Sequence, residues 1–289
     1  MSTEYIHFTA AQKDAARQTD LVALLQSQGE RLKRSGKEYV WRDGSEKVTV
    51  RGNLWFHQYE RIGGDAVDFV RRFYNMDFPQ AVNFLLGNNG GTIQRTEPVK
   101  REPPKPFTLP PKNDNMRRVY AYLLNRRGID REVLSAFVHK GMIYESADYH
   151  NAVFVGYDEH GIARHAHKRG TGSESTYKGN AESCDPRYSF HWTGKDNALY
   201  LFEAPIDMLS FISLHKENWR SHSYAAACCV GDQVLFQMLK ANPNIDTVCL
   251  CMDNDTAGQA ANKRISDKLF IQGIKHEILV PEFKDWNED

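Results

Sequence analysis

From Ala198 onward, short apolar stretches alternate with segments of helical periodicity, and this alternation constrains the fold more than any other feature of the sequence. The predicted order is strand Ala198–Phe202, helix Ile206–Leu214, strand Tyr224–Val230, helix Gln233–Ala241, strand Thr247–Met252, helix Gly258–Gln272 and strand Glu277–Val280. Strands that are apolar along their whole length are typical of a parallel sheet with helices on both faces. We therefore expect an α/β fold, in which ligands bind beyond the carboxyl ends of the strands.

A proline-rich stretch divides the chain into parts. Residues 94–112 hold six of the 11 prolines and show neither a helical nor a strand period, which predicts an extended linker. Before it, a helix, a few short strands and two further helices indicate a small α+β domain. The predicted divisions are domain 1–93, linker 94–112, a segment 113–196 with two helices and a hairpin (Ala152–Tyr157 and Ile162–Lys168), and the parallel-sheet domain 197–289.

Composition excludes several classes of protein. The 37 basic and 37 acidic residues cancel, so the chain is not a uniformly basic nucleoid-type protein, although a local basic groove stays compatible with this balance. The longest apolar runs are far shorter than the roughly 20 residues that span a bilayer, and no signal peptide is visible. The five cysteines are an odd number and lie mostly in apolar stretches. We expect a reduced, cytoplasmic protein without membrane contact.

Carboxylates follow two of the predicted parallel strands. Glu203 comes directly after the first strand, and Asp253 and Asp255 follow the third. Because the carboxyl ends of parallel strands meet at one edge of a sheet, these side chains are expected to lie close together. Such oxygen ligands suit Mg²⁺ or Mn²⁺, which are often held jointly by substrate phosphates. The alternative is that Asp253-Asn254-Asp255 only caps a helix.

The segments LYLFEAPIDMLS and VCLCMDNDTAGQAANKR resemble the Toprim domain of DnaG-type primases, topoisomerases and recombination-linked nucleases. By this resemblance Glu203 has an acid/base or metal-binding role, and Asp253 and Asp255 bind a divalent metal. The segment PEFKDWNED resembles the acidic stretch after the last Toprim strand, which implies that Asp285 is a further metal residue. For Asp285 and Glu288 the alternative is a solvated tail.

Upstream segments are similar to the part of the DnaG-type core that precedes Toprim. They are YLLNRRGIDREVLSAF, AVFVGYDEHGIARHAHKRG, STYKGNAES and FHWTG. This resemblance implies that Lys168, Arg169 and Lys178 face the phosphates of a nucleoside triphosphate or the template backbone. The alternative is that these three residues belong to a solvated loop.

The N-terminal part resembles the zinc ribbon of DnaG-type primases, but its metal ligands are replaced. The positions of the family's cysteine and histidine ligands fall on Asp43, Glu46, His57 and Glu60, and this part contains no cysteine. A structural zinc site uses thiolate and imidazole ligands, so no zinc is expected. The resemblance implies a metal-less zinc-ribbon-like domain held by Trp41, Trp55, Phe56 and its helix faces. A site for another ion, or a half-exposed His57 without such a role, remain alternatives.

Together these features predict a DNA primase-like nucleotidyltransferase of a plasmid or other mobile element. It would make primers on single-stranded DNA from NTPs by two-metal phosphoryl transfer, with a helicase or relaxase of the same element as a partner. The N-terminal domain would contact the template, through residues such as Arg51, Trp55, Arg61, Arg71 and Arg72. The alternatives are a Toprim nuclease that nicks DNA and a catalytically idle protein that binds single-stranded DNA.

Overall fold

The structure is a computed structural model that describes residues 8–43, 46–60, 62–87, 105–228 and 231–289. The chain divides into two compact units, Met1–Pro103 and Pro104–Asp289, so the division falls in the proline-rich stretch. No helix within the described ranges is long and apolar enough to cross a membrane.

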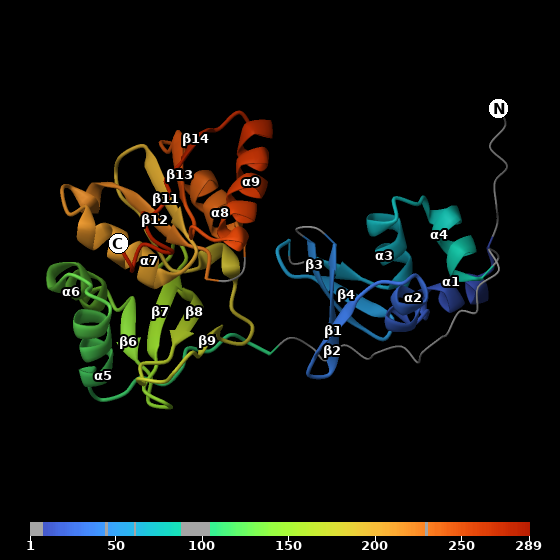
Figure 1. Cartoon of the computed structure of the whole chain (residues 1–289), viewed down its shortest axis with the longest axis horizontal. Coiled ribbons are helices and arrows are strands. Elements are labelled where there is room, and N and C mark those ends of the chain that lie inside the picture. The colour runs from blue at the N-terminus through green and yellow to red at the C-terminus, as the bar shows by residue number, and fades with distance from the viewer. Residues whose placement is uncertain (1–7, 44–45, 61, 88–104, 229–230) are drawn as a thin grey trace. The chain divides into compact units, whose positions relative to one another are not determined.

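The first unit consists of a small antiparallel sheet with helices before and after it in the chain (Figure 1). Its strands pair in the order β1-β2-β3-β4-β5. The elements are α1 (Ala10–Arg17), α2 (Leu21–Ser27), β1 (Leu32–Ser35), β2 (Glu38–Asp43), β3 (Glu46–Arg51), β4 (Leu54–His57), β5 (Gly63–Gly64), α3 (Ala66–Phe73) and α4 (Phe78–Leu85).

Aromatic side chains form the core of this unit. Trp41 and Trp55 are buried and both contact Phe69 edge-on, with ring centroids 5.3 and 6.1 Å away. Phe56, which we expected in the core, is 38% exposed. The reason is the alternation of a strand, which turns neighbouring side chains to opposite faces of the sheet. Burial of Trp55 also contradicts its predicted contact with the template.

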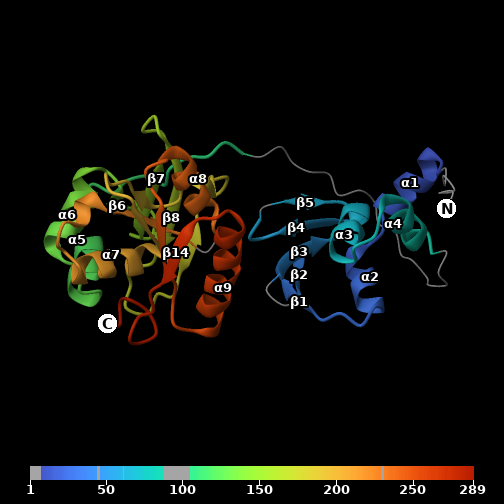
Figure 2. The same ribbon diagram turned by 90° about the horizontal axis from the view of Figure 1, so that it is seen from above.

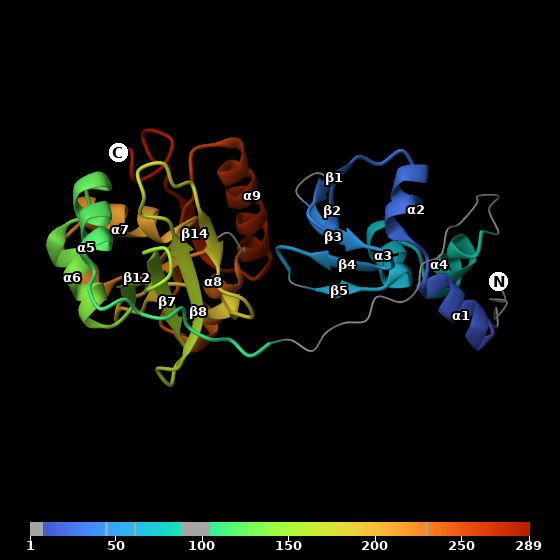
Figure 3. The same cartoon turned by 90° about the horizontal axis from the view of Figure 1, so that it is seen from below.

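The second unit begins with two helical segments and an antiparallel sheet of order β6-β7-β8-β9. The elements are α5 (Arg117–Tyr120), which continues directly into the π-helical turn η1 (Ala121–Arg126), then α6 (Arg131–His139), β6 (Ile143–Glu145), β7 (Ala152–Tyr157), β8 (Ala163–Arg169), β9 (Lys178–Asn180) and η2 (Pro186–Tyr188). The predicted hairpin is present as β7 and β8. In Figure 1 this sheet lies beneath the second sheet of the unit, and in the view from below (Figure 3) it lies in front of it.

The second sheet has the order β10-β12-β11-β13-β14 and is parallel except for β10. This confirms the predicted α/β class, whereas the short antiparallel strand β10 was not foreseen. The elements are β10 (His191–Trp192), β11 (Ala198–Phe202), α7 (Pro205–Leu214), η3 (Trp219–Ser221), β12 (Ser223–Ala226), α8 (Gln233–Ala241), β13 (Thr247–Cys251), α9 (Thr256–Ile271) and β14 (Lys275–Ile278). Residues 229 and 230 of the strand predicted over Tyr224–Val230 lie outside the described residues.

Helices cover both faces of this sheet, as the apolar strands require. Phe202 of β11 packs on α7, while its neighbours Leu199 and Leu201 pack on α8 and α9. Figure 2 shows α7 and α9 on opposite sides of β14. Strands β11 and β13 therefore end between two helical layers, close to the start of α7 and of α9.

Candidate active site

The parallel pairing of β11 and β13 brings the predicted carboxylates to one edge. Phe202 and Cys251 are partners in the register, so the two strands end at the same level. Glu203 follows the first strand, and Asp253 follows the second after one intervening residue. We call the group formed by Glu203, Asp207, Asp253, Asp255 and Asp285 the acidic edge.

Asp253 is a partly buried carboxylate at this edge. Burial, together with the charges of Glu203, Asp285 and Asp255, raises its pKa to about 7, and Lys178 opposes this increase. Its Oδ1 atom is buried and has no hydrogen-bond partner within the described part of the protein. A buried carboxylate oxygen without a partner is costly, so this atom is a natural ligand position for a cation.

Asp207 is a member of the site that the sequence reasoning missed. It lies in the first turn of α7 and is 6% exposed. Burial raises its pKa well above the usual value, and Asp253, Asp285 and Glu203 add to this effect. The signal in the sequence was available, because Asp207 is the single charged residue in the apolar helix PIDMLSFISL and follows Glu203 by one helical turn.

Glu203 is partly buried and lies two residues before the start of α7. Burial raises the pKa of its carboxyl group, Asp255 and Asp285 raise it further, and Lys178 and Lys284 lower it. A carboxylate with a raised pKa is a better proton acceptor near neutral pH.

Asp255 both caps a helix and belongs to the acidic edge. Its Oδ1 accepts hydrogen bonds from the backbone N–H groups of Ala257 and Gly258, each 2.9 Å long, at the start of α9. The alternative that Asp255 caps a helix is therefore correct for its Oδ1 atom. The capping hydrogen bonds do not use its Oδ2 atom. A side chain at Gly258 would place its Cβ 1.9 Å from the carbonyl oxygen of Asp253, so glycine lets the helix begin against this strand end.

The C-terminal segment brings Asp285 to the same place. Asn254, between the two aspartates, donates its backbone N–H to the carbonyl of Lys284 at 2.8 Å. The charge of Asp285 raises the pKa of Glu203, Asp207 and Asp253, which shows that all four lie in one electrostatic neighbourhood. The alternative of a solvated tail does not describe Asp285.

The structure separates the three predicted basic residues. Arg169 of β8 is the direct partner of Lys178 on β9, so the two side chains share a face. Lys178 acts on the pKa of Glu203 and Asp253, which places it at the acidic edge. Lys168 points to the other face of β8, with its Nζ atom 5.7 Å from the ring centre of Tyr177. The structure therefore brings Arg169 and Lys178 together and leaves Lys168 out.

The residues of the acidic edge fit a hard divalent cation. All its donors are carboxylate oxygens, and one of them is buried without a partner. Among the described residues, these oxygens do not meet in threes within 4.8 Å. That spread suits Mg²⁺, which commonly uses one or two carboxylates and completes its shell with water and substrate phosphate.

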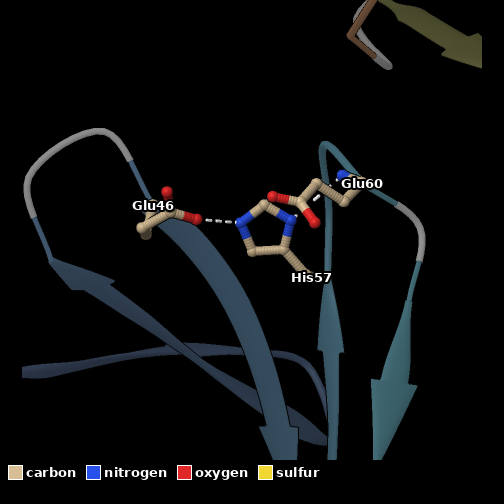
Figure 4. Close-up of side chains that lie close together, drawn as sticks. All are labelled: Glu46, His57 and Glu60. Atoms are coloured by element: carbon tan, nitrogen blue, oxygen red, sulfur yellow. Dashed lines mark hydrogen bonds and ion pairs between the residues drawn. The ribbon is translucent and has the colours of Figure 1, made fainter. Parts of the chain in front are cut away.

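A second polar cluster lies in the first unit, at three of the four positions that correspond to the zinc ligands of the primase zinc ribbon. Ligand atoms of Glu46, His57 and Glu60 all lie within 4.8 Å of one another (Figure 4). His57 is 2% exposed, and its Nε2 atom contacts the carboxylate of Glu46. Asp43, at the fourth position, is exposed and is not part of the cluster.

The hydrogen bonds of this cluster fix the state of the imidazole. Nδ1 of His57 accepts the backbone N–H of Glu60 at 3.0 Å, so in the neutral ring the proton is on Nε2 and points to Glu46 (Figure 4). Glu60 is paired with Arg72 at 2.7 Å. A metal-binding histidine offers one bare nitrogen to the metal and donates from the other. His57 does not fit this pattern, because its bare nitrogen is occupied by a backbone donor.

The predicted template contacts in the first unit are only partly accessible. Arg51 and Arg71 are exposed, and Arg72 is engaged with Glu60. Arg61 lies outside the described residues. Phe56, which is exposed on the sheet, is available for stacking in place of the buried Trp55.

Two family models match the second unit. Residues 200–289 match the family described as Toprim-like, a range that begins within β11 and includes all members of the acidic edge. Residues 121–196 match a family described as a protein of unknown function, DUF3991. The C-terminal part of this chain is therefore a Toprim-like domain, as the sequence predicted.

The individual proteins and solved structures that match this chain share at most 25% of its residues in the comparisons that follow. An uncharacterized protein of Bacillus anthracis is 25% identical over 269 residues, which are 84% of this chain and 77% of the relative. The chain is also similar in structure to the zinc-binding and RNA polymerase domains of Aquifex aeolicus primase (16% identity, 97% of this chain and 82% of that chain, TM-score 0.41). The primase fragment of the bacteriophage T7 primase-helicase matches with 20% identity, over 57% of this chain and 67% of that chain, with a TM-score of 0.42. Scores this low do not bear on function.

Proposed function

We propose that this protein is a Mg²⁺- or Mn²⁺-dependent DNA primase-type nucleotidyltransferase, which makes short primers from NTPs on single-stranded DNA. The observation that carries the proposal is the acidic edge of a Toprim-like domain, with the unpartnered Oδ1 of Asp253 in it and with Lys178 nearby, on a basic face that Lys178 shares with Arg169. Clustered negative charge of this kind is unfavourable without a cation.

Asp253, Asp255 and Asp285 would hold the metal, and Asp207 would support them from α7. When bound, such ions stabilise the charge of the transferring phosphoryl group and of the leaving pyrophosphate. Glu203 would accept the proton of the attacking hydroxyl, because its raised pKa makes it a competent base near neutral pH.

Arg169 and Lys178 would bind the triphosphate. A triphosphate brings about four negative charges to an edge that already carries carboxylates, and cationic side chains nearby reduce this repulsion. Both residues lie on one face, and Lys178 acts electrostatically on Glu203 and Asp253. We exclude Lys168 from this role.

The first unit would contact the single-stranded template. Phe56, Arg51 and Arg71 are exposed there, and stacking combined with phosphate contacts is the usual mode of binding to single strands. The Bacillus anthracis relative bears a plasmid-type designation, pXO2-78, which supports a role in the replication or transfer of a mobile element. A helicase or relaxase of that element would then be the partner protein.

A nicking nuclease of the Toprim type is the second candidate. The exclusion of Lys168 reduces the predicted triphosphate contacts from three to two, and a hydrolytic enzyme needs none of them. A catalytically idle DNA-binding protein is disfavoured, because carboxylates at a DNA-binding edge repel phosphates unless a cation is bound.

One experiment separates these functions. The full chain is incubated with labelled single-stranded DNA, labelled NTPs and Mg²⁺ or Mn²⁺, and both labels are followed on a denaturing gel. New oligonucleotides that contain NTP label support the primase, whereas shortened template without NTP incorporation supports the nuclease. Asp246→Asn is the matched control for Asp253→Asn, because Asp246 precedes β13 and lies at its opposite end.

A further inference from the structure

Asn287 makes an unusual set of contacts for a residue so near the C-terminus. Its side-chain amide donates to the backbone carbonyl of Arg127 at 2.6 Å and to Oγ of Ser210 at 2.9 Å. Its side-chain oxygen accepts from Nη1 of Arg127 at 2.9 Å. Three hydrogen bonds thus tie one side chain to the end of η1 and to the middle of α7.

The neighbouring residues anchor the same segment to the sheet. Nε1 of Trp286 donates to the carbonyl of Cys251 at 3.0 Å, and its ring meets Phe211 of α7 at 5.0 Å. The backbone N–H of Asn287 donates to Oδ1 of Asp285 at 3.0 Å. Figure 1 shows the C-terminal segment, in dark red, beside α7.

These contacts fix Asp285 relative to the other acids. Ser210 lies one turn after Asp207 on α7, and Asn287 lies two residues after Asp285. The hydrogen bond between Asn287 and Ser210 therefore sets the distance between the helix that carries one acid and the segment that carries another. Arg127 extends this network, because its Nε donates to the hydroxyl of Tyr122 at 2.9 Å, which also accepts from Nε of Arg169 at 3.3 Å.

We propose that Asn287 is a positioning residue, which holds Asp285 in the acidic edge by fastening the C-terminal segment to Arg127 and Ser210. This inference rests on the proposed metal-binding role of the acidic edge. It does not depend on whether the bound metal serves primer synthesis or nicking.

The chemistry at this position requires an amide. An aspartate would still accept from the Arg127 guanidinium and could accept from the Ser210 hydroxyl, but it could not donate to the Arg127 carbonyl, which would then face a carboxylate oxygen. It would also add a negative charge next to several carboxylates whose pKa values are already raised by one another. Asn287→Asp therefore distinguishes a positioning residue from a metal ligand, because only a ligand would gain from the added carboxylate.

The test measures Mn²⁺ affinity of the full chain by electron paramagnetic resonance, without nucleotide or DNA. Loss of a residue that orients metal ligands weakens metal binding by about 10- to 100-fold. We expect a loss in that range for Asn287→Ala and Asn287→Asp, and a smaller loss of about 2- to 3-fold for Ser210→Ala, which removes one of three hydrogen bonds. Asn197→Ala is the control, because its side-chain amide bonds Asp246 at the opposite end of β11.

A second measurement follows the segment itself. The ¹⁹F signal of Trp286, labelled with 5-fluorotryptophan and assigned with Trp286→Phe, should shift in Asn287→Ala even without metal. Unchanged Mn²⁺ affinity in Asn287→Ala, or tighter binding in Asn287→Asp, would overturn the positioning role and leave the proposed function intact. Absence of Mn²⁺ binding by the wild-type chain would instead overturn the proposed metal site, and with it the role of Asn287 toward the metal.

Discussion

Two clusters of acidic side chains in this protein differ in whether their polar groups have partners. At Glu46, His57 and Glu60 every ionisable side chain has a partner within the first unit: His57 bonds Glu46 and the backbone of Glu60, and Glu60 pairs with Arg72. At the acidic edge of the second unit, an oxygen of Asp253 has none among the described residues. Burial and the neighbouring carboxylates there raise the pKa of Glu203, Asp207 and Asp253.

The difference shows how a structural site and a ligand-binding site can be told apart. Buried polar groups that satisfy one another cost little and need no ligand. Groups that remain unsatisfied, and that repel one another, gain free energy when a cation binds. We therefore interpret the first cluster as a hydrogen-bonded replacement for a metal, and the acidic edge as a metal site. The following predictions test this contrast.

The largest expected effect is that of Asp253→Asn. It should reduce metal-dependent activity by more than about 100-fold, since even the loss of an outer-shell partner of a metal costs 10- to 100-fold. The fold should persist, because Asp253 is only partly buried and makes no hydrogen bond through Oδ1. The measurements are activity with Mg²⁺ or Mn²⁺ and circular dichroism. Wild-type activity in this variant would remove the acidic edge as the active site.

Loss of the basic face should have an intermediate effect. Arg169→Ala and Lys178→Ala should each weaken apparent NTP affinity by about 10-fold, the value of one charge-assisted hydrogen bond. Binding of a labelled oligonucleotide should fall by less than about 3-fold at the same salt concentration, because many phosphates share that interaction. Lys168→Ala is the matched control and should leave NTP affinity unchanged. An equal loss in Lys168→Ala would contradict the separation of faces on β8.

A smaller effect is expected on the pH dependence of the free energy of unfolding, through Asp253 of the acidic edge. The pKa of Asp253 rises from 3.8 to about 7 on folding, so the folded metal-free protein binds more protons than the unfolded chain between these values. Stability from this group is therefore lost as the pH rises from about 4 to about 7. After allowance for solvent screening the loss is on the order of 1 kcal/mol, or about 2–4 °C in Tm.

The measurement is Tm in EDTA across this pH range for the wild type and Asp253→Asn. The variant should become more stable than the wild type as the pH rises. Asp246→Asn should show no such trend in this range, because hydrogen bonds from Thr247 and Asn197 lower the pKa of Asp246, so the stability from this group changes mainly below about pH 4. If the difference in Tm between Asp253→Asn and the wild type stayed constant across this range, folding would not raise the pKa of Asp253.

The smallest expected effect concerns zinc in the first unit. The purified protein should contain less than one equivalent of zinc, because the bare nitrogen of His57 is taken by the backbone of Glu60. EDTA should leave the unfolding of the first unit unchanged, whereas Mn²⁺ should raise the Tm of the second. One tightly bound equivalent of zinc by elemental analysis, lost together with stability in EDTA, would reverse our interpretation of this cluster.

The sequence by itself determined the elements whose pattern is local. Strand β11 and helix α8 have the predicted bounds, because the apolar runs that define such elements act within a few positions. The parallel sheet also followed from the sequence, and so did the placement of Glu203 and Asp253 at one edge, since the carboxyl ends of parallel strands share an edge. The order of the strands in the sheet did not follow from the sequence.

Only the tertiary structure decided which way individual side chains point and which distant segments meet. Trp55 faces the core while Phe56 faces out, and Arg169 shares a face of its sheet with Lys178 while Lys168 points to the other face. Neighbouring residues on a strand point to opposite faces, so a shift of one position in register exchanges them, and the register depends on partner strands elsewhere in the chain. The contact of Asn287 with Arg127 spans 160 positions in sequence, and no local pattern encodes a pairing of that range.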